Sequence, residues 1–371
     1  MRILVTGGAG FVGSHLVDAL VAEGHAVRIL DNLDPQVHAD RRPPDYLNPG
    51  AEFIHGDVRD RETVFKALVG VEVLFHLAAA VGVGQSMYDV ARYVAVNAMG
   101  AGVVLDVVAN ERHTLRKMIV ASSMSCYGEG KYHCDGCGPV FPRLRSIEQL
   151  AARDWEMRCP ACGASAHPVP TDEEKPLCPT SIYAITKRDH EEMFLAIGRA
   201  YGIPTVALRF FNIFGPRQAL SNPYTGVAAI FSARLLNAHP PIIFEDGLQT
   251  RDFIHVSDIV SGLLTCMHHA EAVDQVFNLG TGRALSVLEL ARLLSERLGF
   301  SGAPRVENRF REGDIRHCYA DITRIRERLG WTPRVAFEEG IDELVRWVRS
   351  QKATDTAERA RAELEQRGLT K

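Results

Sequence analysis

Tyr183 and Lys187 form the pair of residues in this sequence that is best suited to proton transfer. Residues at positions i and i+4 share one face of a helix, and a nearby ammonium group favours the phenolate form of a tyrosine. Ser123 closely follows an apolar run and supplies a hydroxyl that can hold a substrate oxygen beside that tyrosine. A Tyr-x-x-x-Lys pair alone is common by chance, so its meaning depends on the rest of the chain. With Ser123, the pair predicts acid–base chemistry on a C–OH/C=O couple next to a hydride acceptor.

A glycine-rich turn near the N-terminus predicts the binding site of that hydride acceptor. Gly7, Gly10 and Gly13 lie between an apolar run and an amphipathic run, in the strand–turn–helix order that binds the diphosphate of a dinucleotide. Asp31 ends the next apolar run, 18 residues after Gly13, where a carboxylate accepts the ribose hydroxyls of an adenosine. The carboxylate would repel a 2′-phosphate, and Asn32 follows it instead of an arginine. The pattern therefore favours NAD over NADP.

Apolar strands alternate with helical stretches through the first half of the chain, which predicts an α/β fold with a doubly wound parallel sheet of the Rossmann type. We expect a long helix at about 87–110 and helices at 287–298 and 337–349. Residues 1–206 are expected to form the NAD-binding domain, and 207–350 a smaller substrate-binding lobe that partly returns to the sheet. Ligands of such sheets bind at the carboxyl ends of the strands. The charged tail, 351–371, is expected to be a frayed helix without a chemical role.

Composition narrows the classes of function. The chain has 371 residues, an apolar fraction of 46% and a formal net charge of −4, which gives no reason to expect nucleic acid or an anionic membrane as a partner. No segment is expected to span a bilayer, and the first strand begins too early to leave room for a secretion signal. We expect a cytoplasmic protein.

Several further motifs, taken together, resemble the extended short-chain dehydrogenase/reductases, and among them the NAD-dependent nucleotide-sugar epimerase/dehydratase family. The resemblance covers about residues 1–348. It rests on the glycine turn and on motifs at 31–32, 56–57, 76–79, 122–128, 183–187, 209–216, 251–258 and 311–314.

The resemblance implies roles for residues at matching positions. Ser123, Tyr183 and Lys187 would be catalytic. The residues expected to bind NAD are Gly7, Gly10, Phe11, Val12, Gly13, Asp31, Asn32, Asp57, Val58, Leu77, Ala78, Ala79, Asn97, Tyr183 and Lys187. Those expected to bind a nucleotide-diphosphate sugar are Ser123, Ser125, Tyr183, Asn212, Arg251, Arg311 and Arg316. A homodimer formed through helices around 87–110 and 181–201 is a further expectation from the family.

Four of the eight cysteines form two Cys-x-x-Cys pairs, separated by 21 residues, within a segment longer than the family usually needs. We expect residues 129–170 to form a zinc-ribbon-like insert with one short helix opened by Ser146. A structural zinc ion would be held by Cys134, Cys137, Cys159 and Cys162. The alternative is four cysteines without a ligand. A catalytic zinc is not expected, because four thiolates leave no open position.

The residues between Ser123 and Tyr127 separate the reaction types of the family. Dehydratases and decarboxylases carry carboxylates there, whereas this chain has Met124 and Ser125, which favours the simplest reaction, epimerisation at C4 through a 4-keto sugar. The run at 217–227 and the cysteine insert resemble the dTDP-L-rhamnose 4-epimerase subgroup. The alternatives are a UDP-hexose 4-epimerase, a 4-keto reductase supplied with exogenous NAD(P)H, and a protein that binds NAD without turnover.

Overall fold

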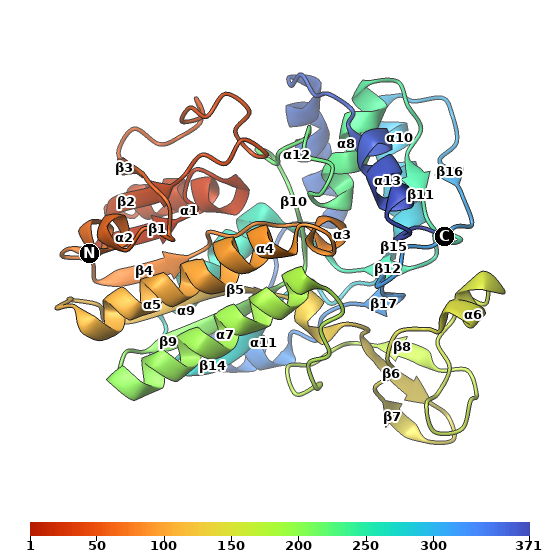
Figure 1. Ribbon diagram of the computed structural model, residues 1–371, viewed down its shortest axis with the longest axis horizontal. Helices are drawn as coiled ribbons and strands as arrows, with labels where there is room; N and C mark the ends of the chain where they lie inside the picture. Colours follow the sequence, from red (N-terminus) through yellow and green to blue (C-terminus); the bar gives the residue numbers. More distant parts are fainter.

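The computed structural model describes all 371 residues, and its centre is a parallel sheet of seven strands (Figure 1). Across the sheet the strands are β14 (Gln275–Leu279), β9 (Thr205–Phe210), β5 (Lys117–Ser123), β4 (Val73–His76), β1 (Arg2–Thr6), β2 (Ala26–Asp31) and β3 (Glu52–His55). Every neighbouring pair is parallel. The predicted Rossmann-type α/β fold is confirmed.

Helices cover both faces of this sheet, so the central strands are buried on both sides and read as continuous apolar runs. One face packs against α1 (Phe11–Ala22), α9 (Val256–His268) and α11 (Thr323–Leu329). The other face packs against α2 (Arg61–Leu68), α5 (Gly100–Asn110) and α7 (Ile182–Tyr201). The strand β14 and the helices α9 and α11 come from the second half of the sequence.

The helix expected at about 87–110 consists of α4 (Val90–Tyr93), a π-helical segment (Val94–Met99) and α5. Contrary to the sequence expectation, Val90–Asn110 is long and apolar enough to cross a membrane by length and composition alone. Its apolar composition has a local cause, because 44% of its most apolar window is buried inside the protein. Core helices pass this composition test as readily as membrane spans do.

The substrate lobe lies beyond the carboxyl ends of the strands. Its core is formed by α8 (Val227–Leu236), α10 (Val287–Leu298) and α12 (Phe337–Arg349). Short strands complete it: β10 (Asn212–Phe214), β11 (Ile242–Ile243), β12 (Thr250–Arg251), β13 (Phe253–His255), β15 (Leu285–Ser286), β16 (Arg305–Val306) and β17 (His317–Cys318). A short helix, α3 (Val83–Ser86), follows β4 and faces this lobe.

The cysteine-containing insert projects from the sheet beside the substrate lobe (Figure 1). It contains a three-stranded antiparallel sheet, β6 (Lys131–Cys134), β7 (Gly138–Val140) and β8 (His167–Val169), and the helix α6 (Ile147–Ala151). The hydroxyl of Ser146 accepts a hydrogen bond from the Gln149 N–H at 3.2 Å and caps α6, as the sequence predicts.

The charged tail differs from expectation. It forms α13 (Ala357–Gln366), which packs against the substrate lobe with Ala360 and Leu364 buried. Beyond this helix, the backbones of Lys371 and Phe310 exchange two hydrogen bonds of 3.0 Å. The tail is therefore held on the lobe by its helix and by its last residue.

Candidate active site

A cavity of about 640 Å³ lies between the carboxyl ends of the sheet strands and the substrate lobe. This is where doubly wound sheets bind their ligands. Most of the residues expected to bind NAD or substrate line it: Gly7, Gly10, Phe11, Val12, Gly13, Asp31, Asn32, Asp57, Val58, Leu77, Ala78, Ala79, Ser123, Ser125, Tyr183, Lys187, Asn212, Arg251 and Arg311. The structure therefore brings together motifs that are far apart in the sequence.

Two glycines make the turn between β1 and α1 tight enough to receive a diphosphate. Gly7 has φ +72°, and a Cβ there would lie 2.8 Å from the Ala78 nitrogen. A Cβ on Gly13 would lie 2.2 Å from the Gly7 carbonyl oxygen. Only glycine fits either position. The turn leaves the N-terminus of α1 facing the cavity, which suits the pyrophosphate of a dinucleotide.

Two carboxylates mark the adenosine end of the cavity. Asp31 accepts hydrogen bonds from the Ala9 N–H at 3.0 Å and the Leu33 N–H at 2.9 Å, and burial raises its pKa while these bonds oppose the rise. Hydrogen bonds from Arg59 lower the pKa of Asp57 to about 2. A fixed carboxylate at the end of β2 fits the ribose of NAD. These features of the chain fit NAD.

Asn97, expected to bind NAD, does not line the cavity. It is fully buried, and its Oδ1 accepts from the Ala80 N–H at 2.8 Å. Its Nδ2 donates to the Ala80 carbonyl at 3.1 Å and to the Thr186 hydroxyl at 2.9 Å. Asn97 therefore joins the segment after β4 to α7 and supports the cavity wall from behind.

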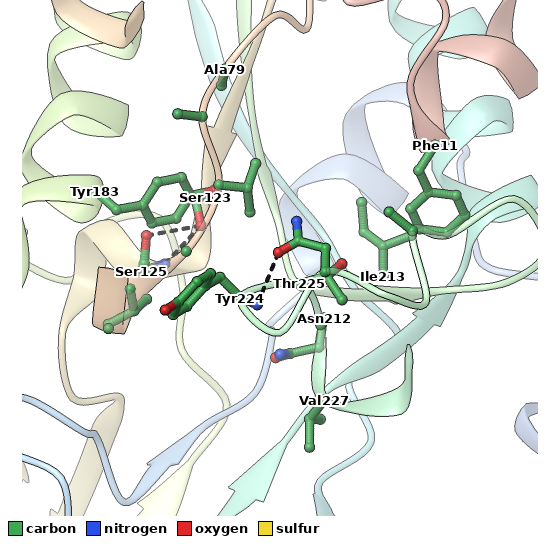
Figure 2. A pocket seen from close by; sticks show the side chains of 18 of the residues that line it. Phe11, Ala79, Ser123, Ser125, Tyr183, Asn212, Ile213, Tyr224, Thr225 and Val227 are labelled. Carbon is green, nitrogen blue, oxygen red and sulfur yellow. Dashed lines mark hydrogen bonds between the residues drawn. The ribbon is translucent and has the colours of Figure 1, made fainter. Parts of the chain in front are cut away.

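The three expected catalytic residues, Ser123, Tyr183 and Lys187, line the cavity, and Figure 2 shows Ser123 and Tyr183 side by side on its wall. Ser123 ends β5, and its Oγ accepts a hydrogen bond from the Ser125 hydroxyl at 2.9 Å. Tyr183 lies in the first turn of α7, which Ser181 caps by accepting the Ala184 N–H at 3.1 Å. Lys187, one turn further on, donates to the Ala121 carbonyl at 2.9 Å. In Figure 2, Tyr224 and Asn212 of the substrate lobe face this wall.

Burial governs the charge states of Tyr183 and Lys187. It raises the pKa of Tyr183 to about 12, and hydrogen bonding to Ser123 opposes that rise. It also lowers the pKa of Lys187 to about 8. In the protein without a bound cofactor, both shifts favour the neutral forms. A positive charge arriving beside Tyr183 would lower its pKa, and the oxidised nicotinamide carries such a charge.

Two arginines of the substrate lobe line the opposite end of the cavity. Arg311 lies with its guanidinium carbon 4.7 Å from the centre of the Phe244 ring, and its Nε donates to Asp314 at 2.8 Å. Arg251 donates from Nη2 to the Ile315 carbonyl at 2.8 Å. Planar guanidinium groups held in this way match the oxygens of a diphosphate.

Arg316, expected to bind substrate, is fully buried, and its guanidinium does not line the cavity. Its partners are three carboxylates, Glu245 at 2.9 Å, Asp246 at 2.7 Å and Glu156 at 2.6 Å. These ion pairs occupy the side chain, so no donor is left for a diphosphate. The sequence spacing alone does not reveal partners so distant along the chain.

Sequence reasoning missed part of the cavity wall. Tyr224 belongs to the run used above as a subgroup signature, but no role was expected for it. Its hydroxyl hydrogen-bonds to the Tyr88 hydroxyl at 2.5 Å and donates to Glu363 of α13 at 2.7 Å. On α13 itself, the residues that line the cavity are Ala357, Ala360, Arg361 and Leu364. Only the Ala360/Leu364 spacing could have signalled that α13 has a packed face.

The four cysteines of the insert also meet. Their Sγ atoms all lie within 4.8 Å of one another, and Cys134 Sγ lies 3.6 Å from Cys162 Sγ. Gly138 and Gly163 directly follow the second cysteine of each pair and have similar φ values, +75° and +74°. The two Cys-x-x-Cys turns are thus alike in position and backbone.

Comparisons with known proteins agree with this geometry. Residues 3–142 match the NAD dependent epimerase/dehydratase family, and residues 163–344 match the GDP-mannose 4,6 dehydratase family. The dTDP-L-rhamnose 4-epimerase of Burkholderia thailandensis is 34% identical over 94% of this chain and 94% of its own length. The UDP-glucose 4-epimerase of Thermotoga maritima, solved with UDP-glucose, has a TM-score of 0.76 and 33% identity, covering 94% of this chain and 99% of its own.

A third similar protein was solved with its cofactor. The UDP-glucuronic acid 4-epimerase of Bacillus cereus, in complex with UDP-glucuronic acid and NAD, has a TM-score of 0.76 and 26% identity, covering 94% of this chain and 99% of its own. Fold, cavity and relatives agree, and the chain belongs to the NAD-dependent epimerase/dehydratase family of extended short-chain dehydrogenase/reductases. Within this family it is an NAD-dependent nucleotide-sugar epimerase.

Proposed function

We propose that the protein is a 4-epimerase for dTDP-L-rhamnose or a related dTDP-6-deoxyhexose, acting through a transient 4-keto sugar. The observation that carries this proposal is the wall beside Tyr183, where Ser123, Met124 and Ser125 line the cavity. None of these side chains is an acid or base near neutral pH, so elimination and decarboxylation lack a suitably placed carboxylate. The similarity to the Burkholderia protein supports the dTDP-sugar over the UDP-hexose alternative.

In this proposal Tyr183 takes the proton from the C4 hydroxyl and later returns it. NAD, held by the glycine turn and Asp31, would supply the acceptor and donor of the C4 hydride when bound. Ser123 holds the C4 oxygen through its hydroxyl, and Ser125 orients that hydroxyl through the 2.9 Å hydrogen bond. Lys187 holds its ammonium group under the same wall, anchored on the Ala121 carbonyl. Arg251, Arg311 and Asn212 bind the nucleotide diphosphate.

A panel of nucleotide sugars tests this proposal. Pure enzyme is incubated without added NADH with dTDP-L-rhamnose, UDP-glucose, UDP-galactose and a GDP-hexose, and the products are separated. We expect the C4 epimer of dTDP-L-rhamnose to form and NAD to copurify with the protein. Faster conversion of the UDP-hexoses would support the UDP-hexose 4-epimerase. A requirement for stoichiometric NAD(P)H would support the reductase, and no conversion of any sugar would support a protein that only binds NAD.

We also propose a structural zinc ion in the insert, held by Cys134, Cys137, Cys159 and Cys162. Zinc–sulfur bonds of about 2.3 Å in a tetrahedron separate the sulfur atoms by roughly 3.8 Å. The 3.6 Å between Cys134 and Cys162 supports this donor set. Elemental analysis should find about one zinc per chain in the wild type and less in Cys159→Ser. Equal metal in both proteins would contradict the assignment.

The expected homodimer and cytoplasmic location are part of the same proposal. Exposed apolar side chains support the dimer, because Val90, Val94 and Met99 on the long helix and Ile185 on α7 are 41, 43, 58 and 43% exposed. These helices pack side by side. No nucleic acid or membrane partner is proposed.

A further inference from the structure

A buried ion pair docks the insert on the substrate lobe. Arg145 of the insert and Glu245 of the lobe are 100 residues apart in the sequence, and their side chains are only 1% and 4% exposed. The contact is bidentate, from Nη1 to Oε2 at 2.9 Å and from Nη2 to Oε1 at 2.8 Å. A planar guanidinium fixes both the position and the orientation of a carboxylate in this geometry.

A second cation completes this network. Arg316 donates to the same Oε2 of Glu245 at 2.9 Å and to Glu156 of the insert at 2.6 Å. The Glu245 carboxylate therefore lies between one guanidinium from the insert and one from the lobe. Because these groups are buried, removing one partner leaves a charge without compensation.

The network reaches the cavity through the backbone of Glu245 and its neighbour. Phe244 and Glu245 both line the cavity, and Glu245 has φ +53°, a left-handed conformation that few residues other than glycine adopt. The buried ion pair holds the side chain of Glu245 while its backbone takes this turn. Phe244 is thereby presented to Arg311, whose guanidinium carbon lies 4.7 Å from the ring centre.

The network reaches the segment 311–316 by a second route. Arg145 Nη2 also donates to the Asp314 carbonyl at 3.3 Å, and the Asp314 carboxylate accepts from Arg311 Nε at 2.8 Å. Arg251 donates to the carbonyls of Ile315 at 2.8 Å and Arg316 at 3.0 Å. Arg251 and Arg311, the two arginines proposed to bind the diphosphate, are thus oriented by a segment that the insert holds.

We propose that Arg145 is a positioning residue for substrate binding, which acts through Glu245 and the segment 311–316 on Arg251 and Arg311. The insert is then part of the substrate site, although none of its own side chains needs to touch the sugar. This inference rests on the proposed binding of the nucleotide diphosphate by Arg251 and Arg311.

The test compares Arg145→Met, the double variant Arg145→Met/Glu245→Gln, and Arg143→Met as the control. The double variant removes the ion pair without leaving a buried carboxylate unpaired, and Arg143 is an exposed residue of the same segment. We expect KM for the nucleotide sugar and the calorimetric Kd of dTDP to rise by roughly 2- to 30-fold in both Arg145 variants. We expect kcat, NAD content and zinc content to change little, because a rise in KM alone indicates lost binding.

Arg145→Lys keeps the buried positive charge but loses the bidentate hydrogen bonding to Glu245. It therefore tests the positioning role of Arg145 even if the methionine variants do not fold. We expect it to weaken dTDP binding by a smaller factor. Unchanged dTDP affinity in the folded, NAD-containing Arg145 variants would overturn the inference. Arg311→Gln tests the proposed diphosphate site separately from the role of Arg145. If dTDP affinity is normal in Arg311→Gln as well as in the Arg145 variants, the diphosphate binds elsewhere and the proposed function of Arg311 fails. If Arg311→Gln binds dTDP more weakly and the Arg145 variants do not, only the role of Arg145 is excluded.

Discussion

Burial and the charge of a bound cofactor act in opposite directions on the pKa of Tyr183. With a pKa of about 12, the free protein holds this tyrosine protonated at neutral pH. The hydrogen bond found for the Lys187 ammonium goes to the Ala121 carbonyl, and burial has the largest effect on the pKa of Tyr183. The phenolate expected from the sequence therefore depends on the positive charge of the bound nicotinamide more than on the lysine alone.

Tyr183→Phe removes the acid–base group and keeps the ring. We expect kcat to fall by roughly 10²- to 10⁴-fold, the usual contribution of a positioned general acid–base group. NAD content should be unchanged, because the variant keeps the glycine turn and Asp31. Ser123→Ala is the matched comparison and should cost less, since it removes one hydrogen bond and leaves the base. Epimerisation by Tyr183→Phe at the wild-type rate would exclude Tyr183 as the base.

The buried imidazole of His76 is expected to make the protein less stable at acidic pH. Burial lowers its pKa to about 3, against about 6.5 in an unfolded chain. Between these values the unfolded state binds more protons than the folded state, so stability falls as the pH drops below about 6.5. At pH 5 this costs about 2 kcal/mol relative to pH 8.

His76→Asn keeps a polar atom near the Thr6 hydroxyl, which lies 3.0 Å from His76 Nδ1, and it does not titrate. Whatever its absolute stability, its loss between pH 8 and pH 5 should be smaller than that of the wild type by about 2 kcal/mol in urea unfolding. The same loss in both proteins would mean that other groups cause the acid sensitivity.

Single residues divide clearly into those that sequence reasoning could place and those it could not. The glycine turn, Asp31 and Ser123 follow strand ends, and parallel strands bring their carboxyl ends to one edge, so spacing was sufficient. Arg316 and Asn97 lie outside the cavity because their partners, Glu245 and Ala80 among them, are set by tertiary packing. No local pattern encodes such partners.

At the scale of elements, local signals predicted boundaries where they were strong. The helix expected at 287–298 has those limits in α10, where Ser286 and Glu289 form a full capping box. The tail was misjudged because α13 is charged and buries only Ala360 and Leu364. Its packing depends on ion pairs such as Arg361–Glu307 at 2.7 Å, which join distant parts of the chain.

Removal of residues 356–371 tests whether α13 is a functional wall of the cavity. Ala360, Arg361 and Leu364 would no longer line it, and Tyr88 and Tyr224 would lose Glu363. We expect KM for the nucleotide sugar to rise, by tenfold for every ~1.4 kcal/mol of lost contact, with NAD retained. Arg359→Ala, at an exposed position of the same helix, is the control. An unchanged KM in the shortened protein would limit α13 to packing.

At the scale of the whole molecule, burial in the core explains one side of the long apolar helix, and the exposed apolar side chains on its other side need a second explanation. One side of Val90–Asn110 is buried, and Tyr93, Val104 and Val108 are among its core residues. The other side exposes Val90, Val94 and Met99, and α7, which packs against this helix, exposes Ile185; we call these four residues the apolar row. Single exposed apolar residues are common on monomers, but several on two helices that pack together would suit an interaction surface. A second copy of this chain would bury that row by packing the same two helices against it.

This surface leads to the last prediction. Val94→Glu and Ile185→Glu place charges in the row, and burying an unpaired charge is costly. We expect the wild type to sediment as a dimer and the double variant as a monomer in analytical ultracentrifugation. Leu248→Glu, at an apolar side chain of the substrate lobe that is 52% exposed, should stay dimeric. Because the glycine turn, Asp31 and the residues Ser123, Tyr183 and Lys187 of one chain line the same cavity, the monomeric variant should still contain NAD. A wild type that sediments as a monomer would contradict the proposed dimer. Dissociation of the dimer by Leu248→Glu would indicate that the interface lies on the substrate lobe instead.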